Sequence, residues 1–187
     1  GASPTLLVNF ASWASGNLFT SPDGVTWTTR SIPATAGLKR ALWLGDRWIA
    51  LGLNGTLMTS PDGLAWTLRA SGTTQTLLAA ATANGLIVVT GAGGTLLTSS
   101  DGGVSWTPRS SATSAALNDV VWTGAEFVAV GSGGQVTRST NGTAWAVAAT
   151  PYTQTLFGTD PFNLRAAVWT GTRIVVVGER NLVATSP

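Results

Sequence analysis

The chain has 187 residues, 44% of them hydrophobic and only 10% charged, with ten Lys and Arg against eight Asp and Glu for a formal net charge of +2. This size and apolar content predict one well-buried domain, and the small, unclustered charge predicts neither a nucleic-acid nor a membrane partner. Cysteine and histidine are both missing, which excludes disulfides, thiolate chemistry, most transition-metal sites and the Ser-His and Cys-His nucleophile systems.

The surface must be covered mainly by Ser, Thr, Asn and Gly, because ordinary soluble domains carry about 25% charged residues and this chain carries far fewer. Such a surface suits a turn-rich β architecture and is common outside cells. We therefore expect an extracellular, cell-surface or virion-surface location. No apolar run approaches the ~20 residues that a helix needs to cross a bilayer.

A turn followed by tryptophan recurs along the chain. GNLFTSPDGVTW, GTLMTSPDGLAW, GTLLTSSDGGVSW and GQVTRSTNGTAW end at Trp27, Trp66, Trp106 and Trp145, spaced 39, 40 and 39 residues apart. A strict period near 40 residues predicts stacked or radial supersecondary units. In each turn an Asp can accept backbone N–H groups and a Gly can take a positive φ, and the Trp is expected to bury its ring between sheets.

Each period contains four short apolar segments. The first segments span 38–45, 78–85, 117–124 and 164–171. The second segments follow directly and end on Gly52, Gly91, Gly131 and Gly178. The nearly continuous Val, Ile, Leu and Ala content of both predicts strands that are buried on both faces. The third segment ends in a Thr-Ser pair and the fourth starts at the repeat Trp, so that each period has the length of a four-stranded antiparallel propeller blade.

The sequence therefore predicts an all-β fold, a β-propeller of about five blades in a single domain over residues 1–187. The repeat units lie at approximately 6–30, 38–69, 78–109, 117–148 and 164–187. The first unit lacks its first strand and the last lacks its fourth, which gives 18 strands. Either five blades close with an imperfect seam, or further sequence or another chain completes a larger ring, and we favour a near-five-bladed arrangement. Because an open seam exposes sheet edges, a homo-oligomer across it is a hypothesis.

One turn carries a resemblance to a known repeat. Ser99, Asp101, Gly103, Ser105 and Trp106 match S-x-D-x-G-x-S-W of the Asp-box, or BNR, repeat, whereas the other copies are one residue shorter and the fourth has Asn141 in place of Asp. The wider unit resembles the Asp-box propellers, which include sialidases, photosystem II assembly factors and phage tail or surface proteins, and the resemblance spans residues 6–187. It implies a propeller in which the box is a structural turn far from the binding face.

The connections from the fourth strand of one unit to the first strand of the next lie on one face of a propeller, usually the ligand-binding face. They span 31–40, 70–77, 110–119 and 148–165. The last is the longest and holds Tyr152, Phe157 and Phe162. An insertion that interrupts a strict repeat and carries three aromatic rings predicts a ligand-binding loop. The alternative is a plug folded over the channel or the seam.

Aligned polar residues at the heads of the first strands predict a mouth on the same face. At one position the units carry Lys39, Ala79, Asn118 and Arg165, and at the next Arg40, Ala80, Asp119 and Ala166. This variation within a uniform framework predicts a ligand-binding mouth lined by Lys39, Arg40, Asn118, Asp119 and Arg165. The alternative is a set of solvated strand ends.

Other repeated residues are interpreted as structural. Arg30, Arg69 and Arg109 each follow a repeat Trp in the outermost strand, so they cannot converge on one substrate. The carboxylates of the turns lie a blade apart and cannot form a metal site. The Gly-rich segments 91–94 and 131–134 lack the Gly-Lys-Ser/Thr of a phosphate-binding loop and are predicted as turns.

These observations predict a non-enzymatic binding or scaffolding propeller, with no cofactor or metal and with a glycan, protein or peptide as the ligand. One alternative is a structural repeat module of a larger surface, phage-tail or assembly-factor protein. The other is a sialidase-like glycoside hydrolase, for which the resemblance implies an Arg cluster, a Tyr nucleophile with a Glu beside it and an acid Asp. Against that requirement the chain offers one Tyr, at Tyr152, and two Glu, at Glu126 and Glu179.

Overall fold

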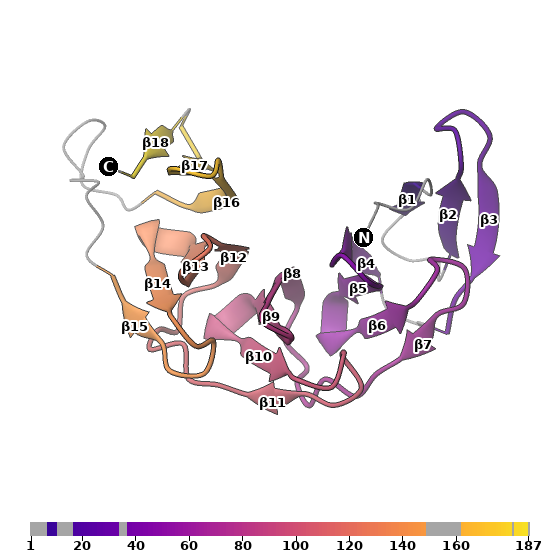
Figure 1. Ribbon diagram of the computed structural model, residues 1–187, viewed down its shortest axis with the longest axis horizontal. Helices are drawn as coiled ribbons and strands as arrows, with labels where there is room; N and C mark the ends of the chain where they lie inside the picture. The colour runs from indigo at the N-terminus through magenta and orange to yellow at the C-terminus, as the bar shows by residue number, and fades with distance from the viewer. Residues whose placement is uncertain (1–6, 11–16, 34–36, 149–161, 181, 187) are drawn as a thin grey trace.

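The computed structural model describes residues 7–10, 17–33, 37–148, 162–180 and 182–186. Within these ranges the protein consists of antiparallel strands in five sheets, with short 3-10 turns and no α-helix. Figure 1 shows the sheets side by side along an arc, each roughly perpendicular to its curve. The all-β propeller predicted from the sequence is therefore confirmed.

Each sheet follows chain order from strand to strand. The first contains β1 (Leu7–Phe10), β2 (Asn17–Ser21) and β3 (Thr28–Ser31). The second contains β4 (Leu38–Trp43), β5 (Trp48–Gly52), β6 (Leu57–Ser60) and β7 (Thr67–Leu68). The third contains β8 (Leu77–Ala83), β9 (Leu86–Gly91), β10 (Leu96–Ser99) and β11 (Thr107–Pro108). The fourth contains β12 (Leu117–Trp122), β13 (Phe127–Gly131), β14 (Val136–Ser139) and β15 (Ala146–Val147), and the last contains β16 (Leu164–Trp169), β17 (Ile174–Gly178) and β18 (Val183–Thr185).

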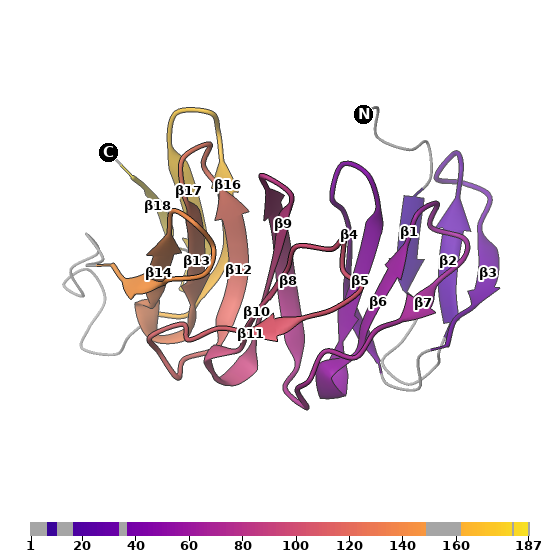
Figure 2. The ribbon, with the colours of Figure 1, turned by 60° about the horizontal axis from the view of Figure 1, so that its bottom comes forward.

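The arc is open. In Figures 1 and 2 the strands β4, β8, β12 and β16 lie on its inner side, and β7, β11 and β15 lie outside. The first and last sheets stand at opposite ends, so the described residues do not close five sheets into a ring. No helix in the described part of the chain has the length and apolar character needed to cross a bilayer.

All four inner strands carry a bulge next to their first residue. Leu38 pairs with Gly52 and Leu77 pairs with Gly91, and the register then shifts by one residue in both strands. The sequence alignment of the third sheet was therefore wrong by one residue, and Leu78 and Ala79 occupy the positions of Lys39 and Arg40. Two adjacent leucines fit the strand start equally well, and a bulge leaves no trace in the hydrophobic pattern.

Burial differs between the first two strands of a sheet. Every residue of β5 and of β13 is buried, as predicted. The same prediction was wrong for β17, where only Val176 is buried and Val177 is exposed. Among the first strands, β4 has no fully buried residue and β16 mixes buried, intermediate and exposed positions. The prediction that the inner strands are buried on both faces was wrong, because one edge of each inner strand borders the concave side of the arc and because no described sheet covers the outer face of β16. The core instead lies between neighbouring sheets, in four hydrophobic clusters.

The Trp turns have the predicted hydrogen bonds. Asp23 Oδ1 accepts the backbone N–H groups of Val25 and Thr26 at 2.8 and 2.7 Å, and Trp27 Nε1 donates to the Gly24 carbonyl at 3.2 Å. The N–H groups of Thr26 and Val25 are the main reason that the pKa of Asp23 falls to about 2. These bonds all lie within the turn.

The fourth turn keeps the same geometry with an amide. Asn141 Oδ1 accepts the N–H groups of Thr143 and Ala144, each at 2.9 Å. The repeated arginines are structural, as predicted, because the Nε atoms of Arg30, Arg69 and Arg109 donate to threonine hydroxyls on the adjacent strand at 3.1, 2.9 and 3.0 Å.

Candidate functional site

One face of the arc is formed by two kinds of loop, and we call it the connection face. It comprises the 3-10 turns η1 (Leu53–Gly55), η2 (Ala92–Gly94) and η3 (Ser132–Gly134) with the connections 70–76 and 110–116. The Gly55 N–H donates to the Gln75 carbonyl at 2.9 Å, and the Ser111 hydroxyl donates to the Gly94 carbonyl at 2.7 Å. Each turn is thus tied to the connection that leads into the next sheet. The Gly-rich segments are turns, as predicted.

Glycine is required where a turn meets a connection. Gly55 and Gly94 have φ values of +69° and +71°, and a Cβ at either position would overlap the carbonyl oxygen of Thr73 or Thr113. A side chain would strain the backbone and push the connection away. The two loops can form a continuous surface only because these positions are glycine.

The predicted mouth contains an ion pair whose carboxylate is buried. Arg40 Nη1 donates to Asp119 Oδ1 at 2.9 Å, and the Asp119 residue is only 5% exposed. The other carboxylate oxygen accepts the Ala167 N–H at 3.0 Å. Asp119 therefore joins three sheets, since Arg40 lies on β4, Asp119 on β12 and Ala167 on β16.

The remaining mouth residues lie near the last two sheets or on β4. Asn118 Nδ2 donates to the Leu164 carbonyl at 2.7 Å. Arg165 forms an ion pair with Glu179, and this pairing is the main reason that the pKa of Glu179 is lowered. Lys39 is exposed at the start of β4. The structure thus brings Arg40 and Asp119 into contact and uses Asn118 to connect neighbouring sheets.

The aromatic loop is only partly within the described residues. Tyr152 and Phe157 lie outside them. Phe162 is buried at 9% exposure, and the Arg180 guanidinium carbon lies 5.9 Å from its ring centroid. Phe162 therefore packs against a neighbouring loop of the last sheet.

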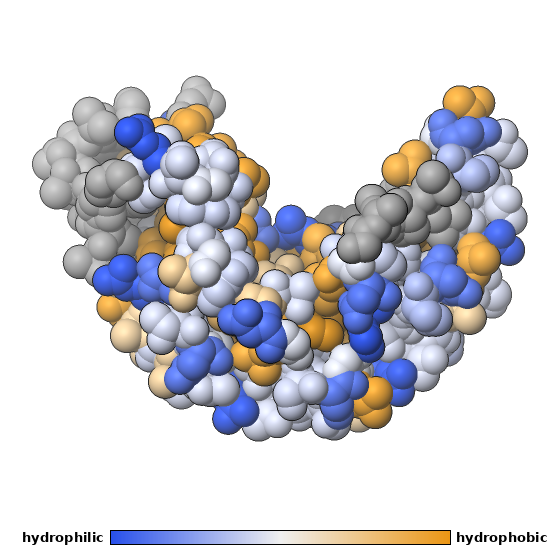
Figure 3. Space-filling model, in the orientation of Figure 1, coloured by the Kyte–Doolittle hydropathy of each residue, from blue (hydrophilic) through white to orange (hydrophobic). Residues whose placement is uncertain are grey.

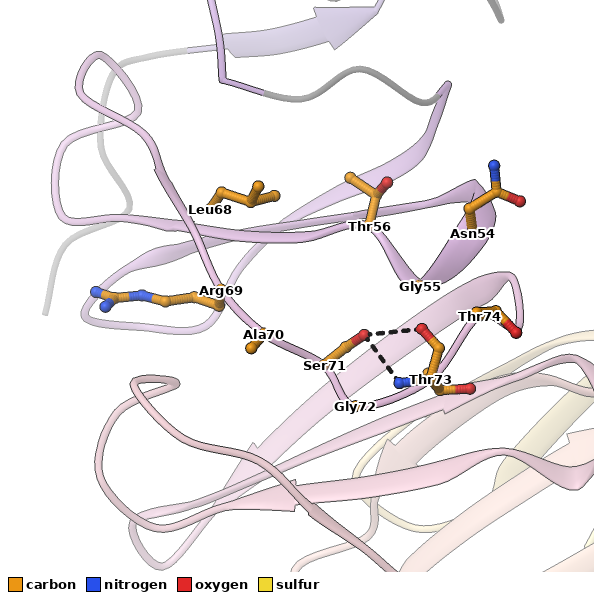
Figure 4. Close-up of a pocket in the computed structure, with 10 residues that line it drawn as sticks. All are labelled: Asn54, Gly55, Thr56, Leu68, Arg69, Ala70, Ser71, Gly72, Thr73 and Thr74. Atoms are coloured by element: carbon orange, nitrogen blue, oxygen red, sulfur yellow. Dashed lines mark hydrogen bonds between the residues drawn. The ribbon is translucent and has the colours of Figure 1, made fainter.

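An open groove of about 740 Å³ lies on the connection face of the second sheet (Figure 4). Its walls are residues 54–56, from η1 and the residue after it, and residues 68–74, from the end of β7 and the following connection. Leu68 is 51% exposed in it, and the other described lining residues are small or polar, with Arg69 as the one charged residue among them. The sequence placed segment 70–77 on this face, but it gave no sign that the 54–56 turn completes a groove.

The described carboxylates all have structural partners. Those of the Trp turns accept backbone N–H groups, Asp46 pairs with Arg47 at 2.7 Å and Glu126 with Arg138 at 3.5 Å, and Asp119 and Glu179 are paired at the mouth. Within the described ranges, no three acidic side chains gather into a group that could hold a metal ion.

Radial antiparallel sheets with repeated turns define a repeat β-propeller. The chain belongs to the DUF6242 beta propeller domain family, whose family model matches residues 18–117. No curated protein matches the chain.

Solved structures show the same fold at low identity. YCF48 from Cyanidioschyzon merolae is 18% identical with a TM-score of 0.67, covering 91% of this chain and 63% of that one. A structure of YCF48 bound to D1 peptide is 14% identical with a TM-score of 0.64, covering 91% and 57%. Virginiamycin B lyase from Staphylococcus aureus is 10% identical with a TM-score of 0.74, covering 91% and 58%. The chain thus spans about three fifths of the length of these structures.

Proposed function

We propose that this propeller is a non-enzymatic scaffold that binds an extended peptide segment of a partner protein on the connection face. The groove of the second sheet carries the proposal. It combines the exposed Leu68 with hydroxyl groups and with main chain left accessible at the exposed Gly72. Main-chain groups with a small apolar contact suit an extended peptide.

Two further observations support this proposal. One fold relative is a YCF48 structure bound to D1 peptide, so this architecture can present a peptide-binding surface. The described carboxylates are all held by structural partners, which leaves no described pair poised for the acid and nucleophile roles of glycoside hydrolysis. A peptide-binding scaffold requires neither role.

Within this proposal the sequence-predicted mouth has two parts. Asn118 and Asp119 hold the sheets, and the exposed Lys39 and Arg165 extend the binding surface along the inner strands. The four Trp turns are proposed to be Asp-box turns with a purely structural role, and the low charge supports an extracellular or surface location.

A matched pair of variants tests the proposal. Leu68 and Val147 occupy the same position on the outer strands of two sheets and are 51% and 50% exposed, but only Leu68 lines the groove. We expect peptides selected from a short random library to bind the parent protein and Val147→Arg alike. Leu68→Arg should lower the affinity for these peptides by a factor of ~10 or more, which is about 1.4 kcal/mol of binding free energy.

Several outcomes would contradict the proposal. If no peptide is enriched, or if the selected peptides bind Leu68→Arg as tightly as Val147→Arg, the groove is not the site. Binding on a glycan array with no peptide binding would favour a lectin. Hydrolysis of a sialoside would favour the glycosidase alternative.

A further inference from the structure

The last sheet presents an apolar face to solvent. Val168, Val177 and Val183 are 59%, 40% and 68% exposed. Val177 stands directly opposite Val183 in the strand register, and Val168 stands opposite Val175. Opposed residues of antiparallel strands share a face, so these four valines form one surface, which we call the valine face. Figure 3 shows hydrophobic residues at both tips of the arc.

The fourth sheet has the same four valines in the same register. They are Val121, Val128, Val130 and Val136. There the next sheet covers them, and Val128 and Val130 are 5% and 0% exposed in a cluster with residues of the last sheet. The valine face is therefore the surface on which a following sheet packs.

The opposite end of the arc carries the complementary surface. In interior sheets the turn Trp packs back onto the preceding sheet: Trp66 joins the cluster of Leu18, and Trp145 joins the cluster of Val88. Trp145 is 9% exposed as a result, whereas Trp27 in the first sheet is 40% exposed and nearby Leu7 is 51% exposed. The indole of Trp27 is thus exposed on the first sheet, and no described sheet packs against it.

We propose that a second copy of this chain docks its first sheet, through Trp27 and Leu7, onto the valine face. The valine face and the exposed face of the first sheet are the two kinds of surface that pack together wherever two sheets of this chain are neighbours. Each chain therefore presents one exposed surface of each kind. The two surfaces differ, so the association is head-to-tail. Burying the exposed apolar surface of both faces supplies the driving force.

Sedimentation equilibrium over a range of concentrations tests the proposal. We expect the parent protein to exceed the monomer mass of 19.1 kDa increasingly as concentration rises. Val177→Arg and Trp27→Arg should each remain monomeric, and Val183→Arg provides a second disruption of the valine face at its most exposed position. Val147→Arg, the same change on an outer strand elsewhere, should associate like the parent.

Mixing the two blocked variants distinguishes the head-to-tail contact from others. An equimolar mixture of Val177→Arg and Trp27→Arg retains one intact surface of each kind, so it should form a 1:1 complex and nothing larger. A parent protein that is monomeric at every concentration overturns the proposal. So does association that survives Trp27→Arg but not Val177→Arg, because two valine faces would then be packed against each other. Circular dichroism checks that each variant is folded, and peptide binding by the monomeric variants is measured separately.

Discussion

Replacing Asp119 with alanine should destabilise the arc more than any loss of a surface ion pair. The carboxylate accepts Arg40 Nη1 at 2.9 Å, the Ala167 N–H at 3.0 Å and the Val120 N–H at 3.1 Å. The substitution removes all three bonds at a position that is 5% exposed. The free energy of unfolding should therefore fall sharply.

The size of this loss in free energy of unfolding follows from the hydrogen-bond acceptor that each donor loses. The buried Ala167 N–H is left without an acceptor, which costs about 1–3 kcal/mol. The Arg40 side chain is 39% exposed and can recover water, so its loss adds about 1 kcal/mol. We expect Asp119→Ala to lower the free energy of unfolding by about 3 kcal/mol. Arg40→Ala should lower it by about 1–2 kcal/mol, because Asp119 then keeps its two N–H donors.

Urea unfolding followed by tryptophan fluorescence measures these losses. Glu126→Ala is the matched control, because its pair with Arg138 is longer at 3.5 Å and the arginine is 58% exposed. It should cost no more than about 1 kcal/mol. The double variant of Arg40 and Asp119 should show a coupling energy of about 1 kcal/mol. A cost for Asp119→Ala no larger than that of Glu126→Ala would refute the reasoning.

Two further predictions concern the turns. Gly55→Ala should lower the stability by about 2–4 kcal/mol, because its Cβ meets the Thr73 carbonyl. Gly72→Ala, with φ of +73° and open space around its Cβ, should lower it by about 1 kcal/mol. Equal losses of stability in thermal unfolding would contradict the overlap at Gly55. The pKa of Asp23 is lowered from 3.8 to about 2, so its contribution to stability is complete above pH ~4 and is lost as the pH falls towards 2. Asp23→Asn, which copies Asn141, should flatten the fall of the melting temperature over that range, and an unchanged slope would count against this role.

The repeat period made the fold predictable, because each Trp turn marks the same position in a sheet. The alignment failed only where Leu77 and Leu78 offered two possible strand starts beside a bulge. Burial of the inner strands was also mispredicted, since apolar composition does not reveal that one edge of these strands borders an open concavity.

The site was predictable in part. Aligning the units placed Arg40 and Asp119 on one face, but their contact depends on the curvature that brings β4 near β12. The groove was not predictable, because its lining is made of the same small residues that form turns elsewhere. The exposure of Trp27 could not be foreseen from a motif that it shares with the buried Trp145.

The contact between Arg40 and Asp119 joins the second sheet to the fourth and passes over the third. Packing between neighbours fixes each sheet only relative to the next, so small differences in angle accumulate along the arc. A contact between alternate sheets limits the total of these differences in angle. It therefore limits how far the radius of the arc can vary. That radius decides whether copies joined head to tail would return to their starting point as a ring or continue as an open filament.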